Sequence, residues 1–229
     1  MSKSGLAVQW RDIRAITFDV GGTLITPWPS VGHIYAEVAA AHGHAGLDPT
    51  RLNQRFATAW RAVEDFRHTR QQWAELVDAT FSGLMAKPPS ATFFDALYDR
   101  FAEAGAWHVF EDVIPALDAL KACGFKLGVI SNWDDRLRPL LQELHLEAYF
   151  ETMSISCEVG ATKPARVMFT QAAEGLSMPP GAMLHVGDSL EMDVRGAEAA
   201  GCVAVWLDRH TNPTRAGAIR TLQELVTGA

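Results

Sequence analysis

The chain of 229 residues is long enough to form one large domain, or a core domain with a smaller companion. Its 48% hydrophobic and 21% charged residues are typical of a globular protein and exclude an intrinsically disordered chain. The net charge of −7 argues against nucleic-acid binding, which uses a basic face, but an anionic small ligand remains compatible with it because local groups and a metal can dominate one site.

The sequence also lacks the usual features of secreted and membrane proteins. No segment approaches the roughly 18 apolar residues of a membrane-spanning helix, and the N-terminal segment has no continuous apolar run. The three cysteines, Cys123, Cys157 and Cys202, are widely spaced and form no metal-binding pair. We therefore expect reduced thiols and a soluble, cytoplasmic protein without a membrane or nucleic-acid partner. The sequence does not indicate its oligomeric state.

The first predicted strand is the apolar run Ala15–Val20, which contains Asp19 and leads into a glycine pair. The segment from about 30 to 104 then contains no convincing strand. It contains instead four helix candidates, each with apolar residues at helical spacing. Trp60 and Trp73 are assigned to the buried faces of these helices. The apolar positions are Ile34, Val38 and Ala41; Leu52, Phe56, Trp60 and Val63; Trp73, Leu76, Val77 and Phe81; and Phe94, Leu97, Tyr98 and Phe101.

Four further apolar runs follow, and helical spacing separates the later ones. The alternation of strands and helices predicts an α/β core with a parallel sheet covered on both faces. We expect the core to comprise residues 1–27 and 105–229, and the helices of residues 28–104 to form an inserted cap. The four runs are Lys126–Ile130, Thr152–Ser156, Met183–Val186 and Val203–Leu207.

Polar residues stand at or just beyond the ends of these strands. Each has an ordinary explanation, since Asp before Gly suits a turn, Ser-Asn can cap a helix and Lys before Pro can lie on the surface. In a parallel sheet, however, all of them fall along one edge. The residues are Asp19, Ser131 with Asn132, Lys163, Asp188 and, five residues further on, Asp193.

Such a set suits the transfer of a phosphoryl group. Asp19 can attack phosphorus and form an acyl-phosphate, which divides one difficult displacement into two steps. Lys163 and Ser131 can hold the equatorial oxygens of the transferred group. Asp19 and Asp188 offer the hard oxygen ligands that Mg²⁺ prefers. We therefore expect a magnesium site and a small anionic, phosphorylated substrate at this edge.

The segments DVGGTL, VISN, TKP and GDSLEMD, in this order, resemble the four motifs of the haloacid dehalogenase-like (HAD) hydrolase superfamily. The helical insert resembles the C1 cap of its subfamily I. The resemblance implies a Rossmann-like core and an aspartyl intermediate formed on Asp19. It also implies metal ligation by Asp19, Asp188 and the carbonyl of Gly21, with Asp193 beside the metal or the lysine. The residues assigned to phosphate binding are Gly22, Thr23, Ser131, Asn132 and Lys163.

Gly21 departs from the family pattern. HAD phosphatases usually carry a second Asp at this position, which protonates the leaving group and then activates water. General acid–base catalysis is typically worth ~10²–10⁴ in rate, so we expect weak turnover unless another group replaces it.

Three alternatives remain open. A haloacid dehalogenase needs no proton for its leaving halide, but Leu190 stands where its fourth motif has Asn, and Asp188 is a carboxylate that a metal-free site does not need. A phosphonate-cleaving relative would need a cap lysine, and Lys87 lies far along the insert. A catalytically degenerate binding protein with this fold would explain Gly21, but not the retained charged residues.

Two tryptophans, Trp28 and Trp133, closely follow the first and second motifs and are candidates for the substrate entrance. The eight histidines form no metal-binding pattern, and we expect core or surface roles for them, including His185.

Overall fold

The computed structural model describes residues 8–209 and 217–227, so that residues 1–7, 210–216 and 228–229 of the two expected core segments lie outside the described residues. Five parallel strands form the main sheet in the order β5-β4-β1-β6-β7, with β1 at its centre. This arrangement confirms the predicted strands and the α/β class. The strands are β1 (Ala15–Phe18), β4 (Lys126–Ser131), β5 (Thr152–Ile155), β6 (Met183–Gly187) and β7 (Val203–Trp206).

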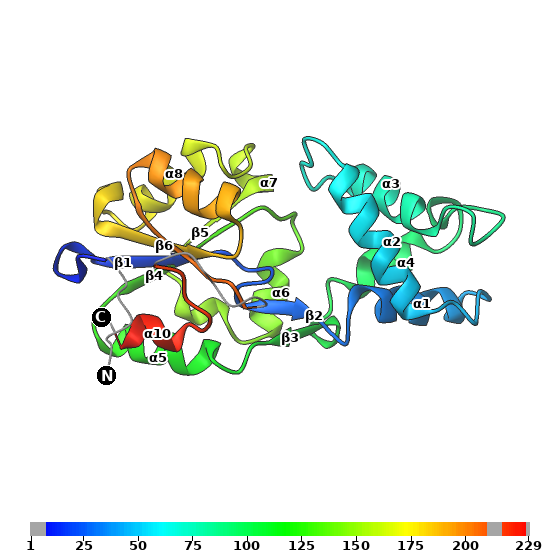
Figure 1. Cartoon of the computed structure of the whole chain (residues 1–229), viewed down its shortest axis with the longest axis horizontal. Coiled ribbons are helices and arrows are strands. Elements are labelled where there is room, and N and C mark those ends of the chain that lie inside the picture. The colour runs from blue at the N-terminus through cyan, green and yellow to red at the C-terminus, as the bar shows by residue number, and fades with distance from the viewer. Residues whose placement is uncertain (1–7, 210–216, 228–229) are drawn as a thin grey trace.

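Helices cover both faces of this sheet (Figure 1). On one face, α5, α6 and α10 pack into a hydrophobic cluster with the strands, and on the other face α8 and α9 form a second cluster. All four residues of β1 are buried, as expected for a central strand covered on both sides. The helices are α5 (Val113–Ala122), α6 (Leu137–Glu143), α7 (Ser156–Val159), α8 (Arg166–Gly175), α9 (Gly196–Ala200) and α10 (Gln223–Val226), with a π-helical turn η6 (Leu190–Arg195) before α9.

The remaining helices form a separate body with its own hydrophobic cluster. They are α1 (Val31–Ala41), α2 (Pro49–Ala62), α3 (Arg70–Phe81) and α4 (Phe94–Arg100). The side chains of Ser30, Asp48 and Thr69 cap the first three by accepting hydrogen bonds from backbone N–H groups of the first turn. Tyr35 of α1 stacks on Phe81 of α3 with ring centroids 5.6 Å apart, so aromatic packing holds this small core together.

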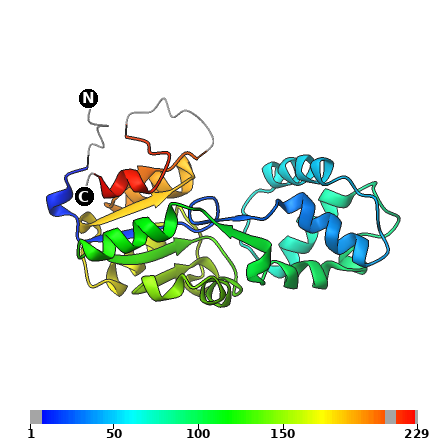
Figure 2. The same cartoon turned by 90° about the horizontal axis from the view of Figure 1, so that it is seen from below.

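An antiparallel ribbon joins the helical body to the sheet domain. It consists of β2 (Ile25–Pro27) and β3 (Trp107–Val109), which flank the inserted helices. Figure 2 shows the two bodies side by side, connected by these strands. Short 3₁₀ turns complete the described structure at Trp10–Asp12, Pro89–Ala91, Ala104–Ala106, Glu147–Tyr149 and Pro180–Ala182.

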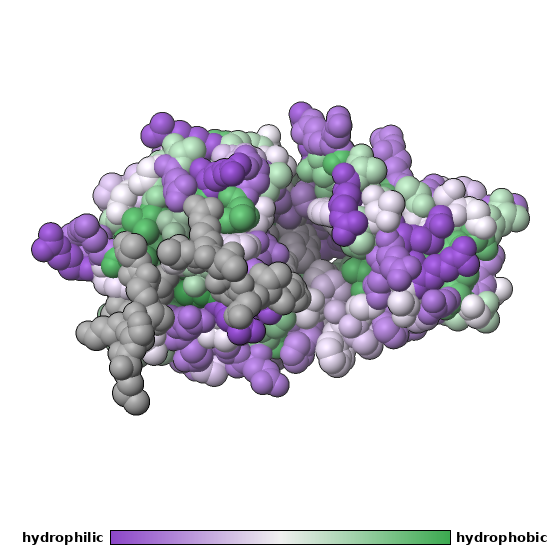
Figure 3. Space-filling model, in the orientation of Figure 1, coloured by the Kyte–Doolittle hydropathy of each residue, from purple (hydrophilic) through white to green (hydrophobic). Residues whose placement is uncertain are grey.

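The surface is hollowed between the sheet domain and the body formed by α1 to α4, which we refer to below as the cap (Figure 3). The residues that directly follow β1, β4 and β6, namely Asp19, Asn132 and Asp188, line this hollow. Within the described residues, no helix is both long enough and apolar enough to cross a membrane.

Candidate functional site

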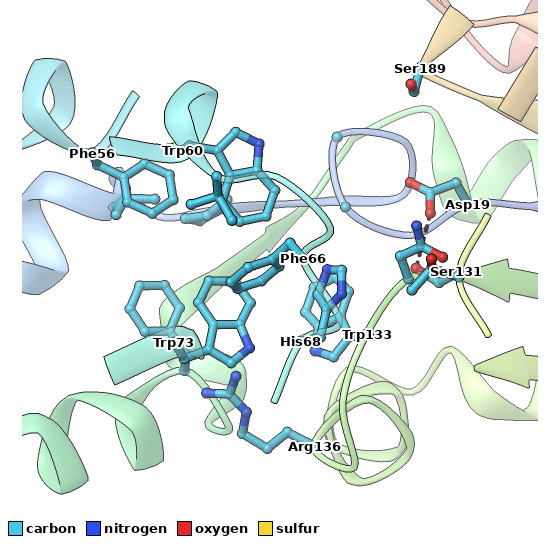
Figure 4. Close-up of a pocket in the computed structure, with 18 of the residues that line it drawn as sticks. Asp19, Phe56, Trp60, Phe66, His68, Trp73, Ser131, Trp133, Arg136 and Ser189 are labelled. Atoms are coloured by element: carbon cyan, nitrogen blue, oxygen red, sulfur yellow. Dashed lines mark hydrogen bonds between the residues drawn. The ribbon is translucent and has the colours of Figure 1, made fainter. Parts of the chain in front are cut away.

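The centre of the site is the carboxylate of Asp19. The residue follows β1 directly, and its backbone N–H donates to the carbonyl of Val186 on β6 at 2.9 Å, so the sheet itself fixes its position. Its Oδ1 atom accepts hydrogen bonds from Ser131 Oγ at 3.0 Å and from Lys163 Nζ at 2.7 Å. Figure 4 shows Asp19 and Ser131 facing each other at the edge of the pocket. Two neighbouring strand ends, those of β1 and β4, and the loop between α7 and α8 therefore meet at one oxygen atom.

Asn132 positions Lys163. The backbone N–H of Lys163 donates to Asn132 Oδ1 at 2.6 Å, and Asn132 Nδ2 donates to the carbonyl of Lys163 at 3.2 Å. The buried ammonium group then reaches both Asp19 and Asp193. Burial alone would lower the pKa of Lys163, but the two carboxylates outweigh it and raise the pKa above its ordinary value. The lysine is therefore a permanently charged partner for Asp19.

Both carboxylate oxygen atoms of Asp193 accept hydrogen bonds from other groups of the protein. Oδ1 lies 2.6 Å from Lys163 Nζ and 3.1 Å from His185 Nε2, and Oδ2 accepts from the backbone N–H of Ser189 at 2.9 Å. Burial favours a protonated carboxyl group, but Lys163 and then His185 hold the pKa of Asp193 well below its usual range. Asp193 is thus an ionised group that anchors the lysine.

His185 lies in the core, one of the two locations that the sequence predicted, and it also joins the hydrogen-bond network of the site, which the sequence did not indicate. The ring is fully buried, and burial lowers its pKa, so the imidazole is neutral. The ionised carboxylate of Asp193 can only accept a hydrogen bond from His185 Nε2, so this ring nitrogen carries the proton. The other ring nitrogen, Nδ1, then accepts from Thr17 Oγ1 at 3.0 Å. The sequence feature that could have indicated this contact is the position of His185 on the predicted strand that leads into Gly187 and Asp188.

The glycines of the site allow close approaches that other residues would block. Gly22 has a φ of 76°, and a Cβ atom there would lie 2.4 Å from Asp188 Oδ2. A Cβ on Gly21 would lie 3.2 Å from Trp133 Cζ3, so an indole ring fills the space beside this position. At Gly187, a Cβ would lie 2.2 Å from the carboxylate carbon of Asp193.

Three carboxylates form a cluster that fits a divalent cation. Oxygen atoms of Asp19, Asp188 and Asp193 all lie within 4.8 Å of one another. Asp188 is exposed as a residue, but its carboxylate lies against Gly22. Desolvation, followed by the charges of Asp19 and Asp193, raises the pKa of Asp188 to about 7. One ammonium group therefore faces three carboxyl groups, and a bound cation would relieve their repulsion.

A cavity of about 900 Å³ extends from this cluster to the cap. Its volume lies in the range of small-molecule sites, about 300–1,000 Å³. Trp60 and Trp73 both line the cavity. Trp73 also packs against the hydrophobic cluster of the cap, as predicted, whereas the assignment of Trp60 to a buried face was wrong, because 40% of its surface is exposed. Helical spacing does not distinguish a core-facing stripe from a cleft-facing one. On the cap side, the aromatic wall consists of Phe56, Trp60, Phe66, His68 and Trp73 (Figure 4).

The structure brings most of the predicted site residues to the cavity. Those that line it are Asp19, Gly21, Gly22, Ser131, Asn132, Lys163, Asp188 and Asp193. Thr23 is fully buried and is not among the lining residues, and its hydroxyl group has no hydrogen-bond partner. Trp133 lines the cavity as predicted, whereas Trp28 lies outside the lining with 55% of its surface exposed.

A polar contact joins the cap to the sheet domain beside the cavity. Trp73 Nε1 donates to Asp134 Oδ2 at 2.9 Å, and Arg136 binds both oxygens of the same carboxylate at 2.8 and 2.6 Å. Arg136 also donates to the carbonyl of Tyr98 at 2.8 Å, and its guanidinium carbon lies 3.5 Å from the centroid of the Tyr98 ring. Sequence reasoning missed Asp134 and Arg136, although they directly follow the VISN segment.

Comparison with known proteins agrees with this geometry. Residues 13–201 match the family model described as haloacid dehalogenase-like hydrolase. The chain is 34% identical over 200 residues to the mouse haloacid dehalogenase-like hydrolase domain-containing protein 3, covering 82% of this chain and 79% of the relative. It is 31% identical over 215 residues to phosphoglycolate phosphatase of Escherichia coli O157:H7, covering 87% and 82%.

Among solved structures, the chain resembles a HAD phosphatase from Thermococcus onnurineus. The TM-score is 0.68 and the sequence identity is 28%, with 94% of this chain and 97% of that chain covered. The match of the family model over most of the chain, together with the shared fold and the charged cluster at the strand ends, leads to one conclusion. The chain belongs to the haloacid dehalogenase-like hydrolases.

Proposed function

We propose that the protein is a Mg²⁺-dependent phosphatase that acts on a small phosphorylated metabolite through an aspartyl-phosphate on Asp19. The observation that carries the proposal is the carboxylate of Asp19, which accepts from Lys163 and Ser131 while lying beside Asp188 at the floor of the cavity. Phosphatases among the similar proteins support the same reaction class. In this proposal residues 1–27 and 105–229 form the catalytic core and residues 28–104 form the cap.

The donor set suits Mg²⁺. Asp19, Asp188 and the carbonyl of Gly21 would hold the ion, since these are hard oxygen ligands and both oxygens of Asp193 already serve Lys163, His185 and Ser189. When bound, Mg²⁺ would neutralise negative charge on the phosphate and keep Asp188 ionised. Glycine at position 21 leaves a backbone carbonyl for this purpose.

The residues of the chain account for the first chemical step. Asp19 Oδ1 is engaged by Ser131 and Lys163, so the carboxylate is fixed in place, and its other oxygen is the one proposed to attack phosphorus. Lys163 and Ser131 then stabilise the negative charge of the transferred group, together with Gly22 and Asn132 on the cavity surface. Asp193 and Asn132 keep the ammonium group of Lys163 in place throughout the reaction.

The second step returns the phosphoryl group to water. Position 21 has no side chain that could deprotonate this water, and Trp133 occupies the adjacent space. Loss of general base assistance typically costs ~10²–10⁴ in rate, so we expect slow hydrolysis of the aspartyl-phosphate. Slow turnover by an otherwise complete site is therefore part of the proposal.

The experiment is phosphate and halide release from a panel of phosphate esters and 2-haloacids, with Mg²⁺ and with EDTA. The proposal predicts phosphate release that EDTA abolishes and that Asp19→Asn removes. The melting temperature of this variant should stay nearly unchanged, because Lys163 keeps Asp193 as its counter-charge. Halide release in EDTA would instead identify a dehalogenase. A folded protein that releases neither product, but binds phosphate esters, would be a binding protein and would contradict the proposal.

A further inference from the structure

Among the described residues of the cavity wall, position 21 has no side chain that could protonate a leaving alkoxide. A side chain at position 21 would meet carbon atoms of the Trp133 ring, which can neither donate nor accept a proton there. The backbone N–H of Trp133 is anchored to Ser156 Oγ at 2.9 Å, and the ring packs against Trp107 with centroids 5.2 Å apart. The space is therefore occupied by a supported aromatic ring rather than left open for another acid.

Other titratable groups on the described cavity wall do not supply the missing acid. Burial among Trp60, Phe66 and Trp73 lowers the pKa of His68 to about 4, so this imidazole is neutral at pH 7. Burial raises the pKa values of Tyr35 and Tyr98, that of Tyr98 to about 12, so that both hydroxyl groups release their protons poorly.

The remaining charged groups of the described lining are engaged elsewhere. Lys163 is bonded to two carboxylates, and Arg136 is bonded to Asp134 and to a backbone carbonyl. Asp188 belongs to the proposed metal site. Asp65 is a carboxylate that forms an ion pair with Arg67 at 3.0 Å. Within the described lining, no cation is left to bind a second anionic group of a substrate.

The cap side of the cavity is aromatic instead. Phe66 lies at 4.8 Å from Trp73 and 5.0 Å from Trp60, centroid to centroid, in edge-to-face contacts. Trp60 keeps 40% of its surface exposed although it is a large apolar side chain. Figure 4 shows these rings on the cap side of the cavity, across from Asp19 and Ser131. A flat apolar ligand would cover this exposed aromatic surface.

Building on the proposed phosphatase activity, we infer that the preferred substrate is a phosphomonoester of an aromatic hydroxyl group that carries no second anionic group. The ring would lie against Trp60, Phe66 and Trp73, and its phosphate would lie at Asp19. The missing acid at Gly21 and the aromatic wall are independent features, and both favour this class.

The bond changes require no proton donor in the enzyme. An oxygen of Asp19 forms a bond to phosphorus while the ester bond breaks, and the electron pair stays on the leaving oxygen. A phenol ionises at a pKa of about 10, as the tyrosine side chain does, so its anion leaves unaided and takes a proton from water afterwards. An alcohol is about as weak an acid as water, with a pKa far above that of a phenol, so an alkoxide needs an acid in order to leave. Water then attacks the acyl-phosphate to give phosphate and the free carboxylate.

The test compares kcat/KM of the Mg²⁺-loaded full chain for four esters. Phenyl phosphate has an aromatic leaving group, benzyl phosphate has the same ring but an alkoxide leaving group, cyclohexyl phosphate has neither, and phosphoglycolate adds a carboxylate. We expect phenyl phosphate to exceed the other three by at least about 100-fold, the lower range of acid assistance. Benzyl phosphate or phosphoglycolate within tenfold of phenyl phosphate would overturn the inference while leaving the phosphatase proposal intact.

A variant pair tests the aromatic wall separately. Acetyl phosphate has a good leaving group but no ring, and serves as the reference. Trp60→Leu is expected to lower kcat/KM for phenyl phosphate about fivefold more than for acetyl phosphate, and Trp60→Phe is expected to restore most of this loss. Trp28→Leu, outside the cavity lining, is the control and should change neither value. Equal effects of Trp60→Leu on both substrates would contradict the aromatic wall as a binding surface.

Absence of phosphate release from phenyl phosphate and acetyl phosphate alike would overturn the proposed function and the inference with it.

Discussion

Asp193 holds the ammonium group of Lys163 at 2.6 Å, and the same ammonium group donates to Asp19 at 2.7 Å. Lys163 and Asp193 are almost completely buried, and Asp19 exposes only a small part of its side chain, at the cavity. One ammonium group therefore supplies the counter-charge for two carboxylates. Burial, with the charge of Asp193 acting in the same direction, still raises the pKa of Asp19 above its ordinary value, although Lys163 opposes this shift.

Removal of this lysine should be costly. Lys163→Met leaves Asp19 and Asp193 without their counter-charge, and we expect a loss of about 3–5 kcal/mol in the free energy of unfolding, as for other buried pairs that lose one partner. Urea denaturation at pH 7 measures this loss in the free energy of unfolding. Asp193→Asn in the Lys163→Met background should recover part of the loss, because it removes one of the unpaired charges. The matched control is Lys126→Met, a half-exposed lysine, which should cost less than about 1 kcal/mol.

Restoring the carboxylate at position 21 should restore acid–base catalysis. Gly21→Asp is expected to raise the kcat for phenyl phosphate at least about tenfold by assisting hydrolysis of the aspartyl-phosphate, and to raise kcat/KM for benzyl phosphate by a similar factor by protonating its alkoxide. Because the new Cβ would lie 3.2 Å from Trp133, the double variant with Trp133→Leu should respond more strongly. Gly21→Ala is the control for the added Cβ alone. Unchanged rates in a folded, Mg²⁺-loaded Gly21→Asp protein would exclude this cause of slow turnover.

Release of Arg136 should broaden the substrate range. Asp134→Asn keeps the size of the side chain but removes the charge that engages the guanidinium group. We expect the ratio of kcat/KM for phosphoglycolate to that for phenyl phosphate to rise at least about tenfold, because a buried charge pair with a carboxylate becomes available. Asp135→Asn, the exposed neighbour, is the control. An unchanged ratio would show that Arg136 does not face the bound substrate.

His68 should make stability fall at mildly acidic pH. In the folded protein, burial lowers its pKa from 6.5 to about 4, with Lys163 and Arg136 acting in the same direction and Asp134 and the carbonyl of Phe66 opposing them. The unfolded chain therefore binds a proton near pH 6.5 and the native protein only near pH 4, so stability is lost as the pH falls through this window. Between pH 7 and pH 5 this contribution is about 1–2 kcal/mol after solvent screening.

The measurement is urea denaturation of the wild-type protein and of His68→Gln at both pH values. The variant should lose less stability on acidification than the wild-type protein, by about 1–2 kcal/mol. Equal losses in the two proteins would show that His68 does not titrate in this window.

The sequence predicted the sheet and the meeting of its polar residues well. Parallel strands bring their carboxyl ends to one edge, so Asp19, Ser131 and Asp188 are neighbours once the strands are recognised. Two adjacent residues of the VISN segment contact different parts of the site. Ser131 donates a hydrogen bond to Asp19, and Asn132 donates one to the backbone carbonyl of Lys163.

Other features depend on how the cap faces the core, and periodicity does not encode this. Trp60 and Trp73 have the same helical spacing as Leu52 and Leu76, yet the leucines are buried in the cap and the tryptophans line the cavity. The contact between Trp73 and Asp134 joins residues 61 positions apart across two bodies. Thr23 belongs to the first motif, but its side chain turns into the interior.

The most direct measurement is rapid chemical quench of the Mg²⁺-loaded protein with phenyl phosphate, followed by peptide mass spectrometry. Since position 21 offers no base for the second step, we expect a burst of about one equivalent of phenol and an acid-stable, hydroxylamine-sensitive phosphoryl group on the peptide that contains Asp19. Both signals should be absent from Asp19→Asn. Continued phosphate release by Asp19→Asn, or turnover of the wild-type protein with the phosphoryl group on another residue, would contradict the assignment of Asp19 as the nucleophile.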